Sequence, residues 1–348
     1  MHRVRVLGWT LVLALITCTS CSLFGSVPEV YWEAGPAWSP DGQYIAFECY
    51  YSRGGYDDVY PEDGYEICIA KSDGTEYRRL TTNDRKDAHP VWSPDGKRIA
   101  FESGGFEGKV YANKIMLIKP DGSDLVELVA GQGSPVWSLD GGHIAYRDIA
   151  GNAAVIDVHG GKPVSLSTAG ARGDDFQLVW SPDGKRIAFM SNRDGHDEIY
   201  VTNAGGTGET QLTYDPLPKS QPVWSPNGEH VAFLSFHETG TGKGYWAVEA
   251  VDPDGNNRKQ FTSRDTHQIV WTSDEQFILR RGVDGVFKLN LKDGTEDLLM
   301  SLPWDATFAL SPDGRLFATI RHDLGAQHTE RIWIMSLDKS KEFKLTPK

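Results

Sequence analysis

The chain has 348 residues and carries 35 Lys and Arg against 48 Asp and Glu, a formal net charge of −13. A chain this acidic lacks the basic surface that neutralises phosphates, so a nucleic-acid partner is not expected. The same charge disfavours broad electrostatic docking on anionic lipid. Any attachment to a membrane must therefore come from a dedicated segment.

The first 21 residues differ in character from the rest. A basic start precedes an apolar run over residues 6–16, which is too short to span a bilayer. Small residues with Cys18 and Cys21 follow, a pattern typical of an export signal. A cysteine at the end of such a signal suggests a bacterial lipoprotein lipidated at Cys21, with Cys18 as the alternative. An ordinary secretory signal with incidental cysteines is the other interpretation.

We therefore expect three parts along the chain. Residues 1–21 form the signal, residues 22–32 form a tether, and residues 33–348 form a single domain. The expected location is extracytoplasmic, with the membrane reached through the lipid anchor.

A five-residue unit, Trp-Ser-Pro-Asp-Gly, recurs through this domain about every 45 residues. Its last two copies are degenerate: one reads Trp-Thr-Ser-Asp-Glu, and the other replaces Trp with Leu. The seven copies begin at Trp38, Trp92, Trp137, Trp180, Trp224, Trp271 and Leu310.

Each repeat contains four strand-like segments, and the fourth repeat is the clearest. Apolar or alternating runs occupy residues 178–181, 186–190, 198–202 and 210–213. Pro-Asp-Gly between the first two runs is a turn signal, because Pro presets φ and Gly accepts a left-handed conformation. Four short antiparallel strands repeated radially predict an all-β, seven-bladed β-propeller. A six-bladed propeller is the alternative, because the sixth copy is degenerate.

Residues 90–101 read Pro-x-Trp-Ser-Pro-Asp-Gly-x-x-Ile-Ala-Phe, a string that resembles the TolB-like propeller repeat. Residues 191–201 resemble it as well. The resemblance covers about residues 33–346. It implies a propeller fold, and the namesake of the family is a periplasmic scaffold in a cell-envelope complex. The same blades also occur in front of serine peptidase domains. This chain departs from the namesake in having about seven repeats instead of six, and no room for a separate N-terminal α/β domain.

No linear catalytic motif is present in the expected domain: the sequence contains no Gly-x-Ser-x-Gly or His-Glu-x-x-His, and no Cys-x-x-Cys occurs after residue 21. We therefore expect a non-catalytic scaffold or sensor that binds a protein or peptide of the cell envelope. The alternative is a propeller hydrolase with its site at the mouth of the central channel.

In a propeller, the loop into each first strand and the loop between second and third strands share one face. These loops vary here, whereas the Ser-Pro-Asp-Gly corners on the other face barely change, and variable loops on a rigid scaffold usually carry binding. The long second-to-third loops are residues 50–64, 104–113, 236–244 and 322–330. In the first of them, interface-type residues gather at Tyr51, Arg53, Tyr56 and Tyr60.

Residues five and three positions before each anchor are expected to ring the channel mouth. With one neighbouring tryptophan, the candidates are Glu33, Asp87, His89, Gln132, Asp175, Gln177, Lys219, Gln221, Gln268, Trp304 and Asp305. This ring is acidic and polar with one lysine, so it favours a basic peptide or a cation over an anion. Polar plugs that hold channel water are the alternative.

Cys49 and Cys68 fall on neighbouring strands of the first blade. In an oxidising compartment they are expected either to form a disulfide or to remain two free buried thiols, offset by one pair in the ladder.

No cofactor is expected, and no metal site is assigned. Two acidic groups leave a weak possibility of Ca²⁺, although neither has the ordered spacing of a calcium loop. They are Asp57, Asp58, Glu62 and Asp63, and Asp194, His196, Asp197 and Glu198.

Overall fold

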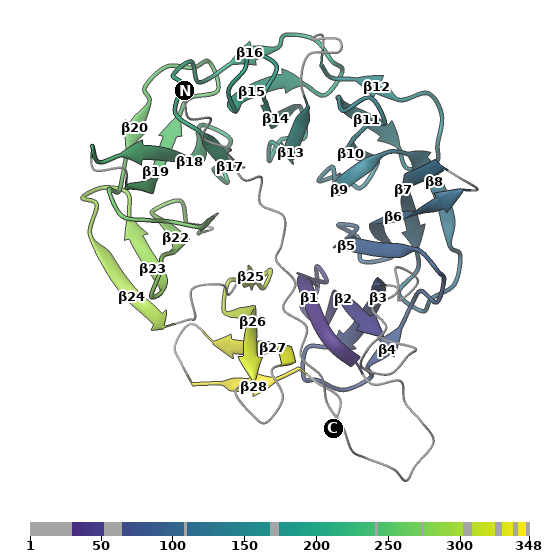
Figure 1. Ribbon diagram of the computed structural model, residues 1–348. Helices are drawn as coiled ribbons and strands as arrows, with labels where there is room; N and C mark the ends of the chain where they lie inside the picture. Colours follow the sequence, from purple (N-terminus) through teal and green to yellow (C-terminus); the bar gives the residue numbers. More distant parts are fainter. Residues whose placement is uncertain are drawn as a thin grey trace, which may run out of the picture.

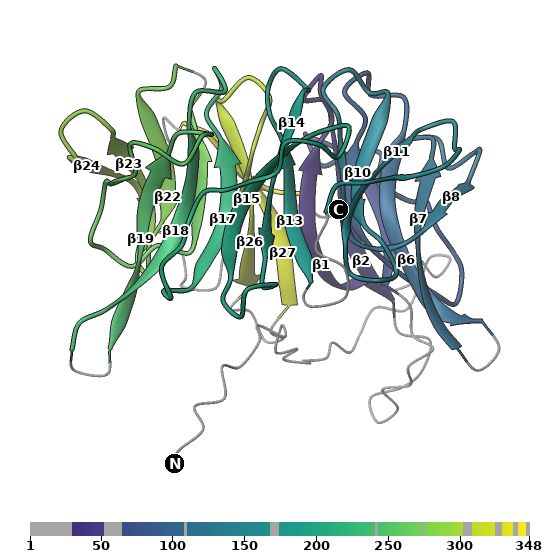
Figure 2. The same ribbon diagram turned by 90° about the horizontal axis from the view of Figure 1, so that it is seen from above.

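The computed structural model describes residues 30–51, 65–107, 110–167, 174–240, 243–272, 274–301, 308–323, 329–336 and 340–345. Within these ranges, the side chains of residues 30–33, 51, 321–323 and 329–331 lie outside the description. Seven four-stranded antiparallel sheets stand radially around a central axis and close into a ring (Figures 1 and 2). The predicted seven-bladed propeller is confirmed, and the six-bladed alternative is wrong.

Each blade is built from four consecutive strands, ordered from the axis outward. Blades 1 to 3 are β1 (Val30–Trp38), β2 (Tyr44–Tyr51), β3 (Tyr65–Lys71), β4 (Arg78–Arg79); β5 (Lys86–Trp92), β6 (Ile99–Glu107), β7 (Val110–Ile118), β8 (Val126–Ala130); and β9 (Gln132–Trp137), β10 (His143–Arg147), β11 (Ala153–Asp157), β12 (Val164–Ser165). Blades 4 and 5 are β13 (Asp175–Trp180), β14 (Arg186–Ser191), β15 (Glu198–Asn203), β16 (Thr210–Gln211); and β17 (Lys219–Trp224), β18 (Val231–Glu238), β19 (Gly244–Val251), β20 (Lys259–Gln260). Blades 6 and 7 are β21 (Gln268–Trp271), β22 (Phe277–Arg281), β23 (Gly285–Asn290), β24 (Glu296–Ser301); and β25 (Phe308–Leu310), β26 (Leu316–Asp323), β27 (Thr329–Ser336), β28 (Glu342–Lys344).

The first strand begins earlier than the expected domain boundary. β1 starts at Val30, inside the segment expected to be tether. Within the described ranges, no helix combines the length and apolar character needed to cross a membrane.

The repeated corner is a turn whose polar groups form hydrogen bonds with one another, as blade 4 illustrates. The Ser181 hydroxyl donates to Asp183 Oδ1 at 2.6 Å and accepts from the Arg186 amide at 2.9 Å. Asp183 also accepts from the Lys185 amide at 3.0 Å, and Gly184 takes φ +67°. The Ser181 bond is the main reason that the pKa of Asp183 lies below its ordinary value. The same three bonds recur in blades 1, 2, 3, 5 and 7, and blade 6 keeps the two bonds to its aspartate, so the corners are structural.

Blade 6 has no glycine at its corner. Glu275 adopts φ +61° where the other six corners have glycine at φ +67° to +72°. A residue with a Cβ is strained there. We expect Glu275→Gly to raise the unfolding free energy by up to about 1 kcal/mol, since relief of strain exceeds the entropy that glycine adds to the unfolded chain. Urea denaturation measures this, with Glu275→Gln as the control that keeps the Cβ. A glycine variant no more stable than the control would contradict the expectation.

The core consists of layers between neighbouring blades. Each of the seven buried apolar clusters combines side chains of two adjacent blades. A single blade exposes both faces and cannot bury them alone, so stacking around the axis supplies the burial.

The recurrent tryptophans also tie each blade to its predecessor. The indole N–H of Trp180 donates to the carbonyl of Val136 at 3.0 Å, and that of Trp224 to the carbonyl of Val179 at 3.2 Å. In each case the acceptor directly precedes the anchor of the previous blade. The same bond is made by Trp38, Trp92, Trp137 and Trp271. Leu310 has no indole to donate, so the interface between blades 6 and 7 lacks it.

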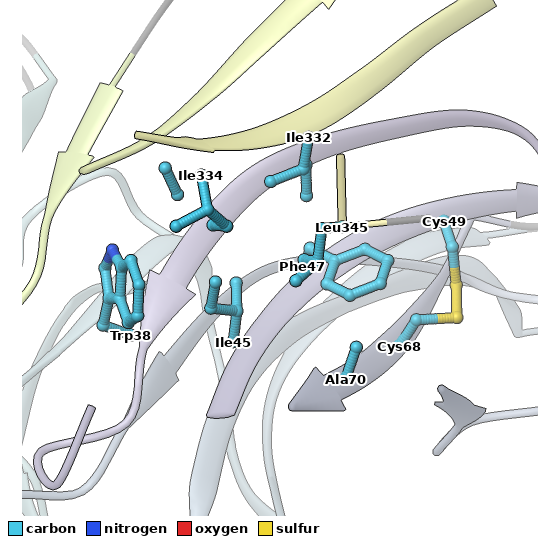
Figure 3. Close-up of a cluster of buried hydrophobic side chains, with 10 residues drawn as sticks. Trp38, Ile45, Phe47, Cys49, Cys68, Ala70, Ile332, Ile334 and Leu345 are labelled. Carbon is cyan, nitrogen blue, oxygen red and sulfur yellow. A yellow bond between two sulfur atoms is a disulfide. The ribbon is translucent and has the colours of Figure 1, made fainter. Parts of the chain in front are cut away.

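The ring closes by packing of complete blades. Trp38 and Phe47 of blade 1 lie in one cluster with Ile332, Ile334 and Leu345 of blade 7 (Figure 3). The indole of Trp38 donates to the carbonyl of Ala309 at 3.0 Å across the same seam. Each blade consists of its own four consecutive strands, so closure needs no strand exchanged between blades.

Cys49 and Cys68 are joined as a disulfide beside this seam (Figure 3). Cys49 pairs with Glu66 in the ladder and Cys68 pairs with Phe47, so the cysteines are offset by two pairs, not by one as expected. Their Cα atoms are nevertheless 5.8 Å apart, within the range that a disulfide spans.

Candidate binding surfaces

The two faces of the ring differ in shape. In blade 2, Trp92 pairs with Ile99 at the corner, whereas Lys86 pairs with Gly104 toward the β6–β7 turn. The corners therefore lie at one end of the blades, and the start of each first strand shares the other end with the second-to-third hairpins. Hairpins β6–β7 and β18–β19 extend past the rim at that end (Figure 2). We call it the hairpin face, and the opposite one the corner face.

Two of the acidic residues five positions before the anchors, Asp87 and Asp175, are buried within the blades. Asp87 is fully buried and accepts from the Ser103 hydroxyl at 2.6 Å and from Asn83 Nδ2 at 2.8 Å. Asp175 accepts from the Ala153 amide at 3.0 Å and from Arg193 Nη2 at 2.8 Å. Their oxygens are already bonded, so the expectation that they present a ligand surface at the channel mouth is corrected.

Lys219 at the same position is also buried and bonded. Its ammonium donates to Asp215 Oδ1 at 2.8 Å and to the carbonyl of Leu217, and lies 3.8 Å from Glu198 Oε2. Burial of a lysine is tolerated because these oxygens neutralise and satisfy it. Lys219 therefore fixes the interface of blades 4 and 5. Gln132 at this position in blade 3 is half-buried.

The residues three positions before the anchors form inter-blade bonds near the axis. Gln221 donates its amide N–H to Gln177 Oε1 at 2.7 Å and its side-chain Nε2 to the carbonyl of His267 at 2.6 Å. Gln268 bonds both the N–H and the carbonyl of Phe308, at 3.0 and 2.7 Å. These glutamines link blades 4 to 7 in succession.

Three of these positions have an uncommon backbone. His89, Gln177 and Gln221 take φ of +56°, +52° and +53°, each inside a register shift of the first strand. Left-handed residues other than glycine are strained and often lie at functional positions. His89 is the half-exposed one with an acidic partner: its Nδ1 lies 3.3 Å from Glu102 Oε2, and that bond raises the pKa of His89.

Several expected site residues lie outside the described residues. They are Cys18, Cys21, Arg53, Tyr56, Tyr60, Trp304 and Asp305, and the acidic group Asp57, Asp58, Glu62 and Asp63. For Glu33 and Tyr51 only the backbone is described, in β1 and β2.

The side chains of the second acidic group, at residues 194–198, do not gather at one site. Asp194 Oδ2 accepts from the Tyr200 hydroxyl at 2.5 Å, and Glu198 accepts from the Thr213 hydroxyl. Burial raises the pKa of Asp197. Among the residues that the structure describes, no three His, Cys, Asp or Glu side chains are grouped to hold a metal ion.

Aromatic pairs mark the extended hairpins on the hairpin face. Phe106 and Tyr111 lie opposite each other near the tip of β6–β7, with ring centroids 5.2 Å apart in an edge-to-face arrangement. Phe106 is 71 % exposed, Val110 is 67 % exposed and Tyr111 is 50 % exposed. In β18–β19, Phe236 packs edge-to-face against Trp246 at 5.5 Å. Both segments were expected to be long loops, but in the structure their strands extend nearly to the turn.

A cavity of about 350 Å³ lies between blades 5 and 6 on the corner face. Its lining residues are Ser225, Asn227, His230, Ala250, Asn257, Lys259, Phe261, Trp271, Glu275 and Leu291. None of the residues predicted to bind a partner lines this cavity. The available signals were the degenerate sixth corner and a histidine, His230, where the preceding repeat has Arg186.

The family match covers most of the ring. Residues 106–348, more than half of the chain, match the family described as the TolB beta propeller domain. The chain belongs to the TolB β-propeller family.

Curated relatives of this TolB-type propeller align over parts of their length. A protein TolB homolog of Chlorobium luteolum is 27 % identical over 42 % of this chain and 33 % of its own. An uncharacterized peptidase of Bacillus subtilis is 30 % identical over 48 % and 23 %. The Tol-Pal system protein TolB of Francisella tularensis is 29 % identical over 68 % and 52 %. The chain thus spans between about a quarter and a half of the curated relatives it matches.

Solved structures share the fold at low sequence identity. An oligogalacturonate lyase in complex with manganese has a TM-score of 0.62 at 14 % identity and covers 90 % of both chains. The β-propeller domain of the Trilobed protease from Pyrococcus furiosus has a TM-score of 0.64 at 13 % identity, covering 92 % of this chain and 99 % of that one. Similarity at this level concerns the fold alone.

Proposed function

We propose that this TolB-type propeller is a non-catalytic scaffold or sensor that captures a protein or peptide partner on the extracytoplasmic side of a bacterial membrane. The observation that carries the proposal is the exposed Phe106–Tyr111 pair on a hairpin that projects from the hairpin face. Attachment through a lipid on Cys21 belongs to the same proposal.

Exposed aromatic side chains on a rigid hairpin are suited to binding a protein. Phe106 and Tyr111 hold each other edge to face, so little side-chain entropy remains to be lost when a partner covers them. Aromatic anchors of this kind carry a large share of interface energy. The corner face, by contrast, uses its polar groups within its own turns.

Two further observations support an extracytoplasmic location. The Cys49–Cys68 disulfide suits an oxidising compartment, where such bonds persist. The chain is also similar to proteins named for the Tol-Pal system. The net charge of −13 argues against nucleic acid as the partner.

Photo-crosslinking from the hairpin tip tests the proposal. A photoreactive residue at position 106 should trap a partner from the host envelope, and the identified partner, once purified, should bind the full chain. We expect the double variant F106A/Y111A to weaken that binding at least about tenfold.

Leu139→Ala is the matched control, because Leu139 is a 64 % exposed apolar residue on the corner face. It should leave affinity unchanged. Equal binding by the wild type and F106A/Y111A would refute the choice of face.

The alternative is a hydrolase with its site at the channel mouth. At the channel mouth, the half-exposed His89 and its partner Glu102 form a pair that could exchange a proton with a substrate. Turnover of a substrate by the purified chain would favour this alternative, since a scaffold requires none.

A further inference from the structure

Two neighbouring inter-blade slots on the corner face are built from equivalent residues. In the slot between blades 4 and 5, the Arg186 guanidinium lies over the Trp224 ring, 4.7 Å from its centroid. Arg186 Nη2 also donates to the carbonyl of Gly228, the corner glycine of blade 5, at 3.1 Å. An aromatic face and a corner carbonyl together hold this guanidinium.

The next slot, between blades 5 and 6, has the same walls without the guanidinium. His230 occupies the repeat position of Arg186, five residues after the corner serine, and Trp271 occupies that of Trp224. The His230 ring is held by Asp252, with Nδ1 2.8 Å from Oδ1. The other oxygen of Asp252 accepts from Asn257 Nδ2 at 2.7 Å, which fixes that carboxylate.

A second substitution widens this slot. The repeat position held by Val201 in blade 4 is held in blade 5 by the smaller Ala250. The result is the cavity of about 350 Å³, a size typical of ligand pockets, with Trp271 and Phe261 among its walls.

We propose that this cavity binds the guanidinium of an arginine side chain presented by a protein or peptide partner. The slot of blades 4 and 5 shows the arrangement within the same molecule: a guanidinium over the anchor tryptophan, bonded at the corner. A partner's arginine would take the place over Trp271 that His230 leaves open.

The lining of the cavity contains a carboxylate with which a guanidinium can pair. Glu275, whose position is glycine in the other corners, lines the cavity and adds a carboxylate beside the place for the guanidinium. Lys259 also lines the cavity, and its ammonium lies 4.8 Å from the centroid of the Phe261 ring. A planar guanidinium stacks on an indole and forms forked bonds to a carboxylate, which an ammonium cannot do equally well.

Titration of the full chain with capped tripeptides of the form Gly-X-Gly tests the inference. The readout is the indole N–H resonance of Trp271, assigned with a Trp271→Phe variant. With X = Arg we expect saturable shifts. With X = citrulline, which has the same shape without the charge, we expect at least about tenfold weaker binding. Equal binding of the citrulline peptide, or tighter binding of a glutamate peptide, would overturn the inference.

Variants that act on the slot itself complete the test. His230→Arg should fill the slot from within and weaken arginine-peptide binding at least about tenfold. Glu275→Gln, which keeps the backbone and shape, should weaken it about threefold to tenfold. Arg186→Ala should open the equivalent slot and add a second shifting indole resonance, from Trp224. If both His230→Arg and Glu275→Gln bind like the wild type, the cavity is not the site.

The cavity and the aromatic hairpin can be tested separately because they lie on opposite faces. F106A/Y111A should leave arginine-peptide binding unchanged, and His230→Arg should leave capture by the hairpin unchanged.

Discussion

Arg280→Ala is expected to lower the unfolding free energy by about 3–5 kcal/mol, the usual cost of removing one member of a buried ion pair. Arg280 is 2 % exposed, and its guanidinium donates to both carboxylate oxygens of Glu296, at 2.7 and 2.5 Å. It also lies over the Phe287 ring, 4.4 Å from its centroid. Alanine removes these contacts and leaves the Glu296 carboxylate largely buried.

The remaining partners of Glu296, which are Arg264 and the Thr262 hydroxyl, are too weak to compensate. Burial alone would raise the pKa of Glu296, yet Arg280, with help from Arg264, brings that pKa below its ordinary value. Arg264 is 70 % exposed and 3.6 Å away, so solvent screens most of its contribution. Urea denaturation at neutral pH, followed by tryptophan fluorescence, measures the loss.

A matched double variant separates the unpaired charge from simple loss of packing. Arg280 stands where other blades place a buried aromatic ring, such as Phe189 in blade 4. Arg280→Phe combined with Glu296→Leu removes both charges and restores that ring, so it should regain most of the stability. If Arg280→Ala costs less than about 1 kcal/mol, the ion pair does not hold blade 6 together.

Local patterns in the sequence were sufficient for the architecture. The corner Ser181-Pro-Asp-Gly184 is specified by four consecutive residues that bond one another, so its recurrence revealed the blades and their number. The strands of blade 4 begin or end within a few residues of the expected ranges. The sequence also predicted the positions of the long hairpins, because the extra residues between two strands of a repeat are visible in the sequence of that repeat.

The side-chain networks could not be predicted in the same way. Asp87 and Lys219 share one repeat position, but whether each faces the channel or the interior depends on partners elsewhere in the chain, such as Ser103 and Asp215. Arg280 likewise depends on Glu296 from another strand. The cavity beside Trp271 depends on how the side chains of blades 5 and 6 pack against each other, which the repeat pattern alone does not specify.

The second large effect is a pH dependence at the interface of blades 1 and 2. Glu66 is 2 % exposed, and burial raises its pKa to about 7. Its Oε2 accepts from the Thr81 hydroxyl at 2.7 Å, and the carboxylate of Asp87 nearby raises the pKa further. At the matching interface of blades 4 and 5, Lys219 occupies the repeat position of Asp87, and its positive charge compensates the negative charge of Glu198.

The sign of the effect follows from proton binding. The folded chain holds the Glu66 proton up to about pH 7, whereas the unfolded chain releases it near the ordinary value of 4.5. Stability from this group is therefore fully present below about pH 4.5 and is lost as the pH rises to about 7. A shift of this size corresponds to a loss of at most about 3 kcal/mol.

Glu66→Gln isolates this contribution, because glutamine resembles the protonated acid and cannot ionise. We expect the variant to match the wild type near pH 4.5 and to exceed it by about 2–3 kcal/mol at pH 8. Urea denaturation across this range measures the difference. Glu198→Gln is the control: it removes the equivalent carboxylate but leaves Lys219 buried without it, so it should destabilise at pH 8. If the wild type and Glu66→Gln keep a constant difference from pH 4.5 to 8, Glu66 does not titrate in this range, and the two acids are already neutralised by another group.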